Sequence, residues 1–158
     1  MQLRELFQPA DLLVDFEPAD KWEAIRALVQ HLVAREHVGE AEAVAISDAV
    51  LARERSMSTG MEHGIAIPHA AVDEVEDVVA CLGIVRREEG LTFDSIDGQP
   101  TRLVVLLVIP RPKKLLHIRT LADIARVLGR DSVREALVTA ASPEEAWEAL
   151  AQGDVSVT

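Results

Sequence analysis

Two almost uninterrupted apolar stretches in the middle of the chain limit the folds that this sequence can adopt. They cover residues 78–86 and 102–109. A strand that is apolar at nearly every position is buried on both faces, as the central strands of a helix-covered sheet are. The two stretches therefore predict the centre of a sheet with helices packed on both of its sides.

Helices are predicted before these strands, where apolar residues recur every three or four positions. The first helix begins at Asp20 and Glu23, which resemble a capping box. Its buried stripe is expected to comprise Trp22, Ile25, Leu28, Val29, Leu32 and Val33. A second, alanine-rich helix is expected over residues 41–53, with Val44, Val50 and Leu51 facing inward.

Helices are also predicted after the strands. The first is expected to end at Gly129 and to bury a stripe made of Leu115, Ile118, Leu121, Ile124, Ala125 and Leu128. Two shorter helices are expected to start at Ser132, with Glu135 three residues on, and at Ser142, with Pro143 and Glu145 behind it.

Two further strands, over residues 12–16 and 65–70, complete the predicted pattern, and Asp97 with Gly98 supplies a turn between the two long strands. The expected order is β-α-α-β-β-β-α-α-α. This order indicates an α/β protein, with three layers (α/β/α) and a mixed sheet. Residues 1–158 are expected to form a single domain, because the chain contains no repeat or linker.

Composition excludes several classes of partner. The net charge of −11 repels nucleic acid and anionic lipid, so neither is an expected partner. Cys81, the single cysteine, lies within an apolar stretch and is expected to be a buried, inert thiol. We expect a cytoplasmic protein with no membrane insertion, because no signal peptide or membrane-spanning stretch is present.

Polar groups gather around one histidine in residues 53–70. Glycines such as Gly60 and Gly64 allow a tight backbone path, the hydroxyls of Ser58 and Thr59 can bind an anion, and a guanidinium fits phosphate oxygens. His69 follows a short apolar strand and a proline, and an imidazole with a pKa near neutrality is a competent nucleophile. These are the parts of a phosphate-binding site.

The residues alone leave other interpretations open. His69 can be a simple hydrogen-bonded histidine at a strand end, and Ser58-Thr59-Gly60 can serve only to satisfy loop backbone groups. Arg53 and Arg55 lie near a helix carboxyl end, where cations are favoured without any ligand. His63 and His69 suggest a metal site, but their spacing matches no strong zinc signature, and no nucleotide-binding motif is present. Neither a metal nor a cofactor is expected.

The sequence nevertheless resembles the type 2 enzyme IIA domains of the bacterial phosphoenolpyruvate-dependent sugar phosphotransferase system. The resemblance rests on Arg53-Glu54, Ser58-Thr59-Gly60 and Gly64-Ile65-Ala66-Ile67-Pro68-His69. It extends to Asp97-Gly98-Gln99-Pro100 and to His117-Ile118, and so covers essentially the whole chain. The family often has glycine where Met57, Glu62 and Ala70 stand.

This resemblance implies that the chain is a phosphohistidine carrier. His69 would accept a phosphoryl group, on its Nε2 atom, from phosphorylated HPr, with His117 contacting the phosphate and Arg53 stabilising it. Ser58, Thr59, Gly60 and Gly64 would form the substrate-binding loop. The group would pass to an enzyme IIB component in a fructose or mannitol system, or the state of His69 would regulate a target protein, as in nitrogen-regulatory members. A non-catalytic binding module of the same fold is the alternative.

Overall fold

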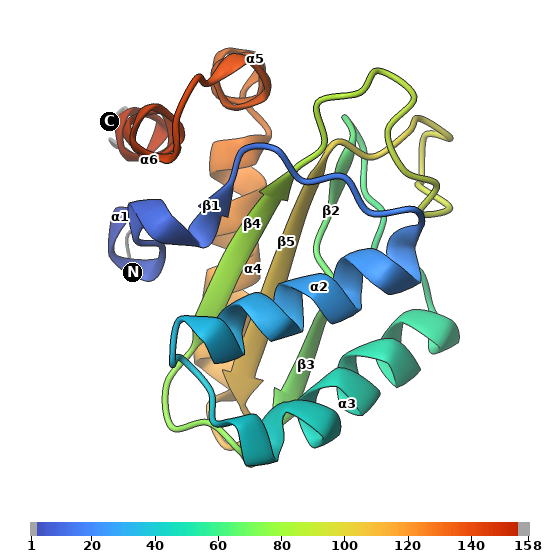
Figure 1. Cartoon of the computed structure of the whole chain (residues 1–158), viewed down its shortest axis with the longest axis vertical. Coiled ribbons are helices and arrows are strands. Elements are labelled where there is room, and N and C mark those ends of the chain that lie inside the picture. The colour runs from blue at the N-terminus through green and yellow to red at the C-terminus, as the bar shows by residue number, and fades with distance from the viewer. Residues whose placement is uncertain (1–2, 155–158) are drawn as a thin grey trace.

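The computed structural model describes residues 3–154 and arranges them around one sheet (Figure 1). The helices are α1 (Leu3–Leu6), α2 (Lys21–Ala34), α3 (Ala43–Ser56), α4 (Lys114–Leu128), α5 (Asp131–Thr139) and α6 (Pro143–Gly153). The strands are β1 (Leu12–Leu13), β2 (Ile65–Ala66), β3 (His69–Val72), β4 (Val79–Ile84) and β5 (Leu103–Pro110). Short 3-10 turns precede β1 (Pro9–Asp11) and α3 (Glu40–Glu42).

Strand β5 is the centre of a mixed sheet, which confirms the predicted fold class. It pairs antiparallel with β4 and parallel with both β2 and β3, while β1 lies parallel to β4 on the far side. All eight residues of β5 are buried. The apolar pattern of the two long stretches therefore identified the two central strands.

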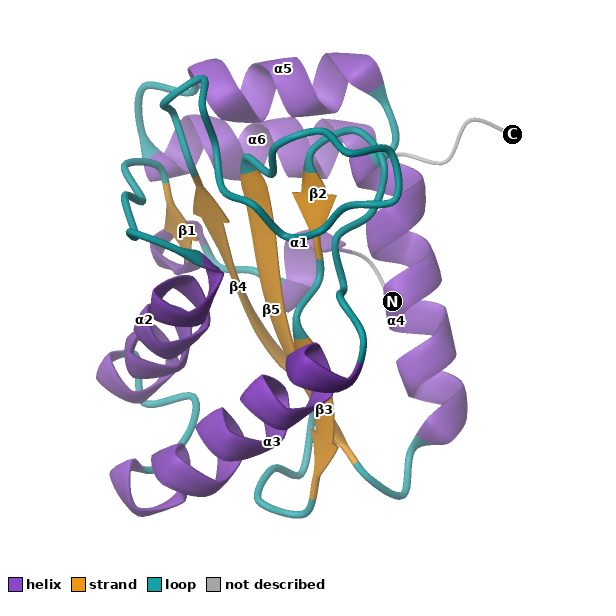
Figure 2. Cartoon of the chain, turned by 90° about the vertical axis from the view of Figure 1, so that its right-hand side faces the viewer, coloured by secondary structure: helices purple, strands orange, loops and turns teal. Residues whose placement is uncertain are grey.

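Helices cover both faces of the sheet (Figures 1 and 2). Successive side chains of β5 alternate between two cores: Val104 and Leu106 pack with α2 and α3, whereas Val105 and Leu107 pack with α4, α5 and α6. This alternation is the period of two that a strand imposes. Cys81 lies in the core beneath α2, fully buried, as the sequence predicts.

The strand that we predicted over residues 65–70 is interrupted in its middle. Strands β2 and β3 pair with two successive segments of β5, and Ile67-Pro68 separates them. Proline has no backbone N–H, so it cannot donate to a strand ladder. Pro68 still accepts a bond from the Leu107 amide through its carbonyl oxygen, at 3.0 Å. The interruption leaves His69 as the first residue of a new strand.

Two of the three predicted helix starts are capped by side chains. Asp20 accepts a bond from the Glu23 amide at 2.8 Å, and Ser142 accepts one from the Glu145 amide at 3.2 Å. The cap that we predicted at Ser132 is wrong, because α5 begins one residue earlier and its N-cap residue makes no side-chain cap bond. Gly129 ends α4 as expected, and Gly98 occupies a turn with φ of 72°.

Three residues that we predicted to face inward are exposed. Val44 lies outside the stripe of α3, which follows Ala43, Ile46 and Val50. In α4, Leu115 and Ile118 are 71% and 65% exposed. The buried residues of α4 are Thr120, Ile124, Val127 and Leu128, with half-buried His117 at the head of this stripe, so the prediction is confirmed at Ile124 and Leu128. In the first turns of α4 the polar residues His117 and Thr120 lie inward, which the hydrophobic pattern did not predict.

The first and last helices of the described chain pack together. Trp147 of α6 donates its indole N–H to the carbonyl oxygen of Phe7, at 2.8 Å, just beyond α1. Phe7 itself is buried in the core beneath α6. Within residues 3–154, no helix combines the length and the apolar character needed to cross a membrane.

Candidate active site

The loop between α3 and β2 is folded back onto the strand that follows it. The Met61 amide donates to the Ile65 carbonyl at 2.7 Å, and the Ile67 amide donates to the Thr59 carbonyl at 3.2 Å. Gly60 forms a bridge with Ala66. The polar residues of this loop are therefore fixed against β2, next to the point where β3 begins.

His69 faces the α4 side of the sheet. Its neighbours Ala70 and Val72 are buried in the core under α2 and α3, so the side chain of His69 points the other way. Strand β3 pairs only with β5 and forms an edge, which leaves the imidazole half-buried. A ring in this position is both fixed and accessible.

A backbone contact selects the tautomer of His69. Its Nδ1 atom lies 2.7 Å from the carbonyl oxygen of Ile67, two residues back across Pro68. A carbonyl oxygen only accepts, so Nδ1 carries the proton and donates it. The Nε2 atom is then left with its lone pair, as a nucleophile requires.

His117 comes from α4 and meets His69 at the sheet edge. The centroids of the two rings are 5.3 Å apart, with an interplanar angle of 70°. The two histidines are far apart in the sequence, and they meet because β5 and the turn after it return the chain to the start of α4. An anion bound at Nε2 of His69 would have an imidazole N–H donor close by.

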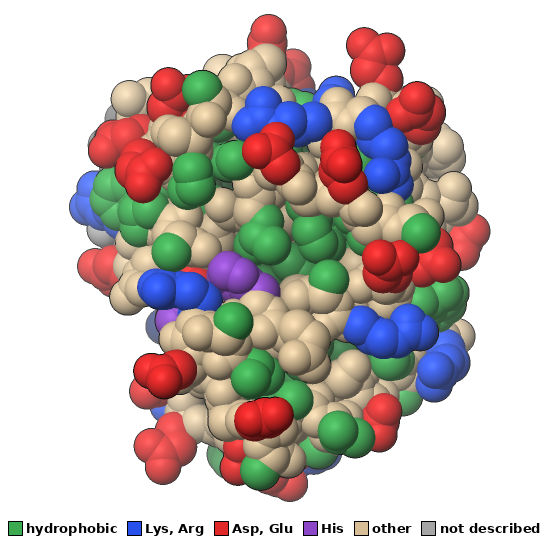
Figure 3. Space-filling model, in the orientation of Figure 1, with side chains coloured by type: hydrophobic (Ala, Val, Ile, Leu, Met, Phe, Trp, Pro, Cys, Tyr) green, Lys and Arg blue, Asp and Glu red, His purple; other side chains and the backbone are tan. Residues whose placement is uncertain are grey.

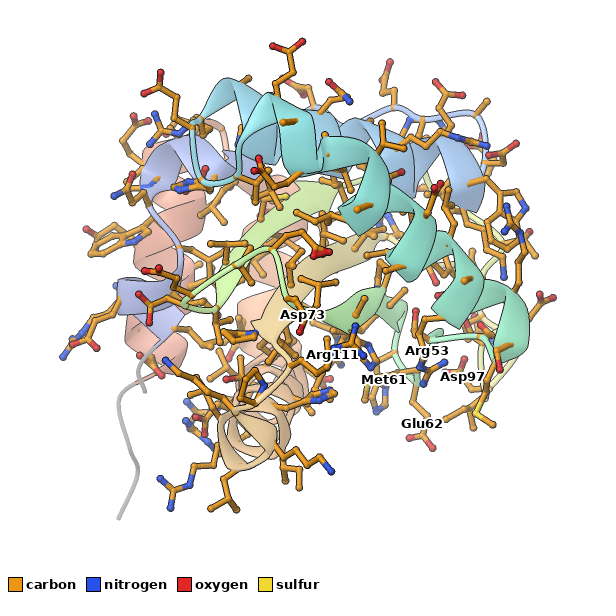
Figure 4. All side chains as sticks on the ribbon, turned by 90° about the horizontal axis from the view of Figure 1, so that it is seen from below. Arg53, Met61, Glu62, Asp73, Asp97 and Arg111 are labelled. Carbon is orange, nitrogen blue, oxygen red and sulfur yellow. The ribbon has the colours of Figure 1, made fainter. Side chains whose placement is uncertain are left out.

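Arg53 approaches from α3, on the other side of the same edge. Its Nη1 donates to the carbonyl oxygen of Met57 at 2.9 Å, which ties the arginine to the start of the loop. Figure 4 looks onto this end of the molecule, where Arg53 and Arg111 both lie between α3 and α4. The sequence expectation that Arg53, His69 and His117 share one site agrees with this geometry.

The surroundings favour the neutral form of both rings. Burial lowers the pKa of His69, and the nearby Arg53 and His117 lower it further, while the bond to Ile67 and the charge of Glu54 act in the opposite direction. Burial and Arg53 likewise lower the pKa of His117. At pH 7 the His69 imidazole is therefore neutral, which is the nucleophilic state.

Both hydroxyls of the Ser58-Thr59-Gly60 segment are bonded within the protein. Ser58 donates to the carbonyl oxygen of Phe93 and accepts from the Gly60 amide. The Thr59 hydroxyl donates to Glu54. Gly60 fits closely, because a Cβ there would lie 2.7 Å from the carbonyl oxygen of Phe93. The two hydroxyls therefore hold the segment against Phe93 and Glu54.

The structure places Gly64 away from the two histidines. It has φ of 73°, and its carbonyl oxygen accepts bonds from the amides of Arg102 and Leu103 at the start of β5. It lines a separate hollow with His63 and Asp97, at the opposite end of β2. Gly64 thus serves the turn into β2. The described residues contain no cluster of three or more potential metal ligands.

The Arg53-Glu54 pair was recognised in the sequence, but no role was predicted for Glu54. Glu54 is only 2% exposed, and its carboxylate accepts bonds from both the backbone and the hydroxyl of Thr59. A glutamate between two arginines near a helix end is typical of a solvated face. Successive residues of an α-helix point about 100° apart around its axis. The sequence could therefore have predicted that Glu54 and Arg53 point in different directions.

Cations collect beside His117 although the protein is acidic overall. A hollow next to this histidine is lined by Arg111, Lys113 and Lys114. Asp73 and Asp77 pair with Arg111 and Lys113. Acidic and basic side chains are interspersed over the face seen in Figure 3, and the net charge of the chain is −11. The three cations of the hollow exceed these two carboxylates by one, so this edge is less acidic than the chain as a whole.

Comparisons with known proteins agree with this chemistry. Residues 5–153 match the family described as "Phosphoenolpyruvate-dependent sugar phosphotransferase system, EIIA 2". A Haloferax volcanii protein named PTS system fructose-specific EIIA component is 32% identical over 145 residues, which cover 91% of this chain and 92% of that protein. A nitrogen regulatory protein from Klebsiella oxytoca is 35% identical over 108 residues, which cover 68% of this chain and 65% of that protein.

Solved structures share the fold. The nitrogen regulatory protein IIA-Ntr of Neisseria meningitidis has a TM-score of 0.82 and 26% identity, over 94% of this chain and 98% of that one. The Escherichia coli enzyme IIA for mannitol, in complex with phosphorylated enzyme IIB, has a TM-score of 0.77 and 26% identity, over 92% of this chain and 97% of that one. These proteins have the same mixed sheet between helical layers.

Proposed function

The chain belongs to the EIIA 2 family of the phosphoenolpyruvate-dependent sugar phosphotransferase system, and we propose that it carries a phosphoryl group on Nε2 of His69. The donor is the phosphohistidine of HPr. One observation carries the proposal: the Nδ1 proton of His69 is committed to Ile67 at 2.7 Å, while Arg53 and His117 act on the same ring. This arrangement leaves an activated nitrogen beside groups that stabilise an anion.

The transfer step needs no metal. The lone pair of Nε2 attacks phosphorus in line, so a new N–P bond forms on His69 as the N–P bond of the donor imidazole breaks. Arg53 and the N–H of His117 stabilise charge on the equatorial phosphoryl oxygens. The bond from Nδ1 to the Ile67 carbonyl then stabilises the positive charge that develops on the substituted ring.

Two onward routes are supported by similar proteins. A solved relative is bound to phosphorylated enzyme IIB, which favours transfer from His69 to such a component in a sugar transport system. Other relatives are named nitrogen regulatory proteins, which favours a role in which the state of His69 controls binding to a target. Both routes use the same phosphohistidine, and both fit a protein of the cytoplasm.

The experiment is phosphorylation by phosphoenolpyruvate, enzyme I and a cognate HPr, followed by intact mass and acid-lability measurements. Wild type should gain one acid-labile phosphoryl group, and His69→Gln should gain none while remaining folded. His63→Gln is the matched control, because His63 is exposed and lines the other hollow. Phosphate retained by His69→Gln would refute the assignment.

The roles of Arg53 and His117 are distinguished from that of His69 by the rate of phosphoryl transfer. Arg53→Ala and His117→Ala should still accept phosphate, because His69 keeps its bond to Ile67, but each should slow transfer by about 100-fold or more, as the loss of an oxyanion donor does. A wild type that accepts no phosphate from its cognate HPr would instead favour a non-catalytic binding module.

A further inference from the structure

Glu54 is a buried carboxylate with both oxygens engaged, and it lies next to Arg53 on α3. Its Oε1 accepts the Thr59 hydroxyl at 2.5 Å, and its Oε2 accepts the Thr59 amide at 3.0 Å. Lys21, at the start of α2, places its ammonium 3.4 Å from the same Oε2. Glu54 therefore joins α2, α3 and the loop that precedes His69.

A charge in such a position requires compensation. The side chain of Glu54 is 0% exposed and that of Lys21 only 11% exposed. Burying an unpaired carboxylate is costly, and the ammonium of Lys21 and the two Thr59 donors compensate for that cost at Glu54. Lys21 also contacts Asp94, whose side chain is 75% exposed and solvated. The ammonium is thus the principal buried counter-charge of Glu54.

Arg53 and Glu54, neighbours on α3, hold different residues of the loop between α3 and β2. Arg53 holds its first residue through the Met57 carbonyl, and Glu54 holds Thr59 two residues later. The carbonyl oxygen of Thr59 in turn accepts the amide of Ile67, whose own carbonyl accepts Nδ1 of His69. A continuous chain of bonds therefore runs from Glu54 through Thr59 and Ile67 to the reacting ring.

From these contacts we propose that Glu54 is a positioning residue for His69, and that Lys21 sets the net charge which Glu54 presents to that histidine. The kinetic part of this inference rests on the proposed function; the electrostatic part does not. Lys21 acts from α2 without touching the site, so the two residues form a pair whose members have opposite effects on the field at His69.

Three substitutions separate position from charge. Glu54→Gln removes the negative charge and leaves Lys21 without its buried partner. Lys21→Met removes the compensating charge and leaves the carboxylate of Glu54 uncompensated. Thr59→Val is the matched control, because it removes only the hydroxyl bond and changes no charge.

The first measurement is a titration of the His69 imidazole by nuclear magnetic resonance on the unphosphorylated chain. The charge of Glu54 raises the pKa of His69. Glu54→Gln should therefore lower this pKa, Lys21→Met should raise it, and Thr59→Val should leave it near the wild-type value. A double Glu54→Gln/Lys21→Met variant should return toward wild type. Shifts of equal sign in the two charge variants, or no shift, would overturn the inference.

The second measurement is the rate of transfer from phosphorylated HPr. Glu54→Gln should slow transfer by about 10- to 100-fold, since a displacement of ~1 Å near a reacting group costs up to about 100-fold. Thr59→Val should slow it less, and His63→Gln should leave it unchanged. A wild-type rate in folded Glu54→Gln would overturn the positioning role.

The two proposals fail in different ways. If wild type accepts no phosphate, the proposed function is refuted, while the opposite shifts of the His69 pKa still decide the charge pair. If Glu54→Gln does not fold, Lys21→Met decides alone: a raised His69 pKa supports the pair, and an unchanged one overturns it.

Discussion

Gly60→Ala should damage both the stability and the activity of this protein, for a steric reason that the structure specifies. The added Cβ would lie 2.7 Å from the Phe93 carbonyl oxygen, 2.9 Å from Ser95 Oγ and 3.0 Å from Phe93 Cβ. Two of these atoms cannot swing away as the end of a flexible side chain can. The loop itself must therefore move, and it carries Thr59 on one side and the bridge to Ala66 on the other.

The magnitude follows from the cost of overpacking. Adding a methyl group to a tightly packed position costs about 1–3 kcal/mol. In a chain of this size, each kcal/mol lowers the melting temperature by about 2–4 °C. We therefore expect a decrease in Tm of roughly 2–12 °C. A shift of ~1 Å in the loop, transmitted through Thr59 and Ile67 to His69, would slow phosphoryl transfer by up to about 100-fold.

The assay combines thermal unfolding with the rate of phosphorylation by HPr. Gly98→Ala is the control, because φ of 72° strains an alanine there although a Cβ would meet nothing within 4 Å. That variant should lose about 1 kcal/mol through backbone strain and retain the wild-type transfer rate. A Gly60→Ala protein with wild-type Tm and rate would refute the steric reasoning.

Three further predictions concern titratable groups. Because burial lowers the pKa of His69, the rate of phosphoryl acceptance should begin to fall at a lower pH than it would for an imidazole of ordinary pKa, as a pH–rate profile with wild type would reveal. Asp11 is 1% exposed and accepts bonds from His31, Arg35 and His37. Burial raises its pKa, but the bonds and charges of these partners outweigh burial and lower it overall. The stability that Asp11 contributes is therefore present above its unfolded pKa of about 3.9 and lost as the pH falls through the lower folded value. Asp11→Asn should cost about 3 kcal/mol in urea unfolding at pH 7, and the difference from wild type should shrink below about pH 4; a difference independent of pH would contradict this account. Burial raises the pKa of the Cys81 thiol, so an aromatic disulfide reagent should react with it only in unfolding concentrations of urea, and rapid labelling of the native protein would be contrary to expectation.

Helices and strands that are encoded by a few neighbouring residues could be predicted from the sequence. The apolar stretches located β4 and β5, and Asp20 and Ser142 marked the starts of α2 and α6, because each of these signals acts within a few residues. The break at Pro68 was also within reach, since proline cannot donate to a ladder on either side. Pro68 therefore already indicated that residues 65–70 form two strands and not one.

The features that were missed depend on distant contacts. Glu54 is buried where Lys21, from another helix, and Thr59, from the following loop, meet its carboxylate. In the first turns of α4 the inward position belongs to His117, and a polar residue directed at a site does not register in a hydrophobic pattern. Propensity and periodicity measure the average environment of a residue type, and a functional site departs from that average.

The bond between Trp147 and Phe7 has a consequence for how this fold can be combined with others. It brings α1 and α6 together at one corner of the molecule, whereas α3 and β3 lie at the opposite corner (Figure 1). Polypeptides joined before α1 and after α6 would both leave the fold on the β1 side of the sheet. The edge of the sheet formed by β3, which begins at His69, lies on the opposite side. This edge would therefore stay accessible if the fold were part of a longer chain.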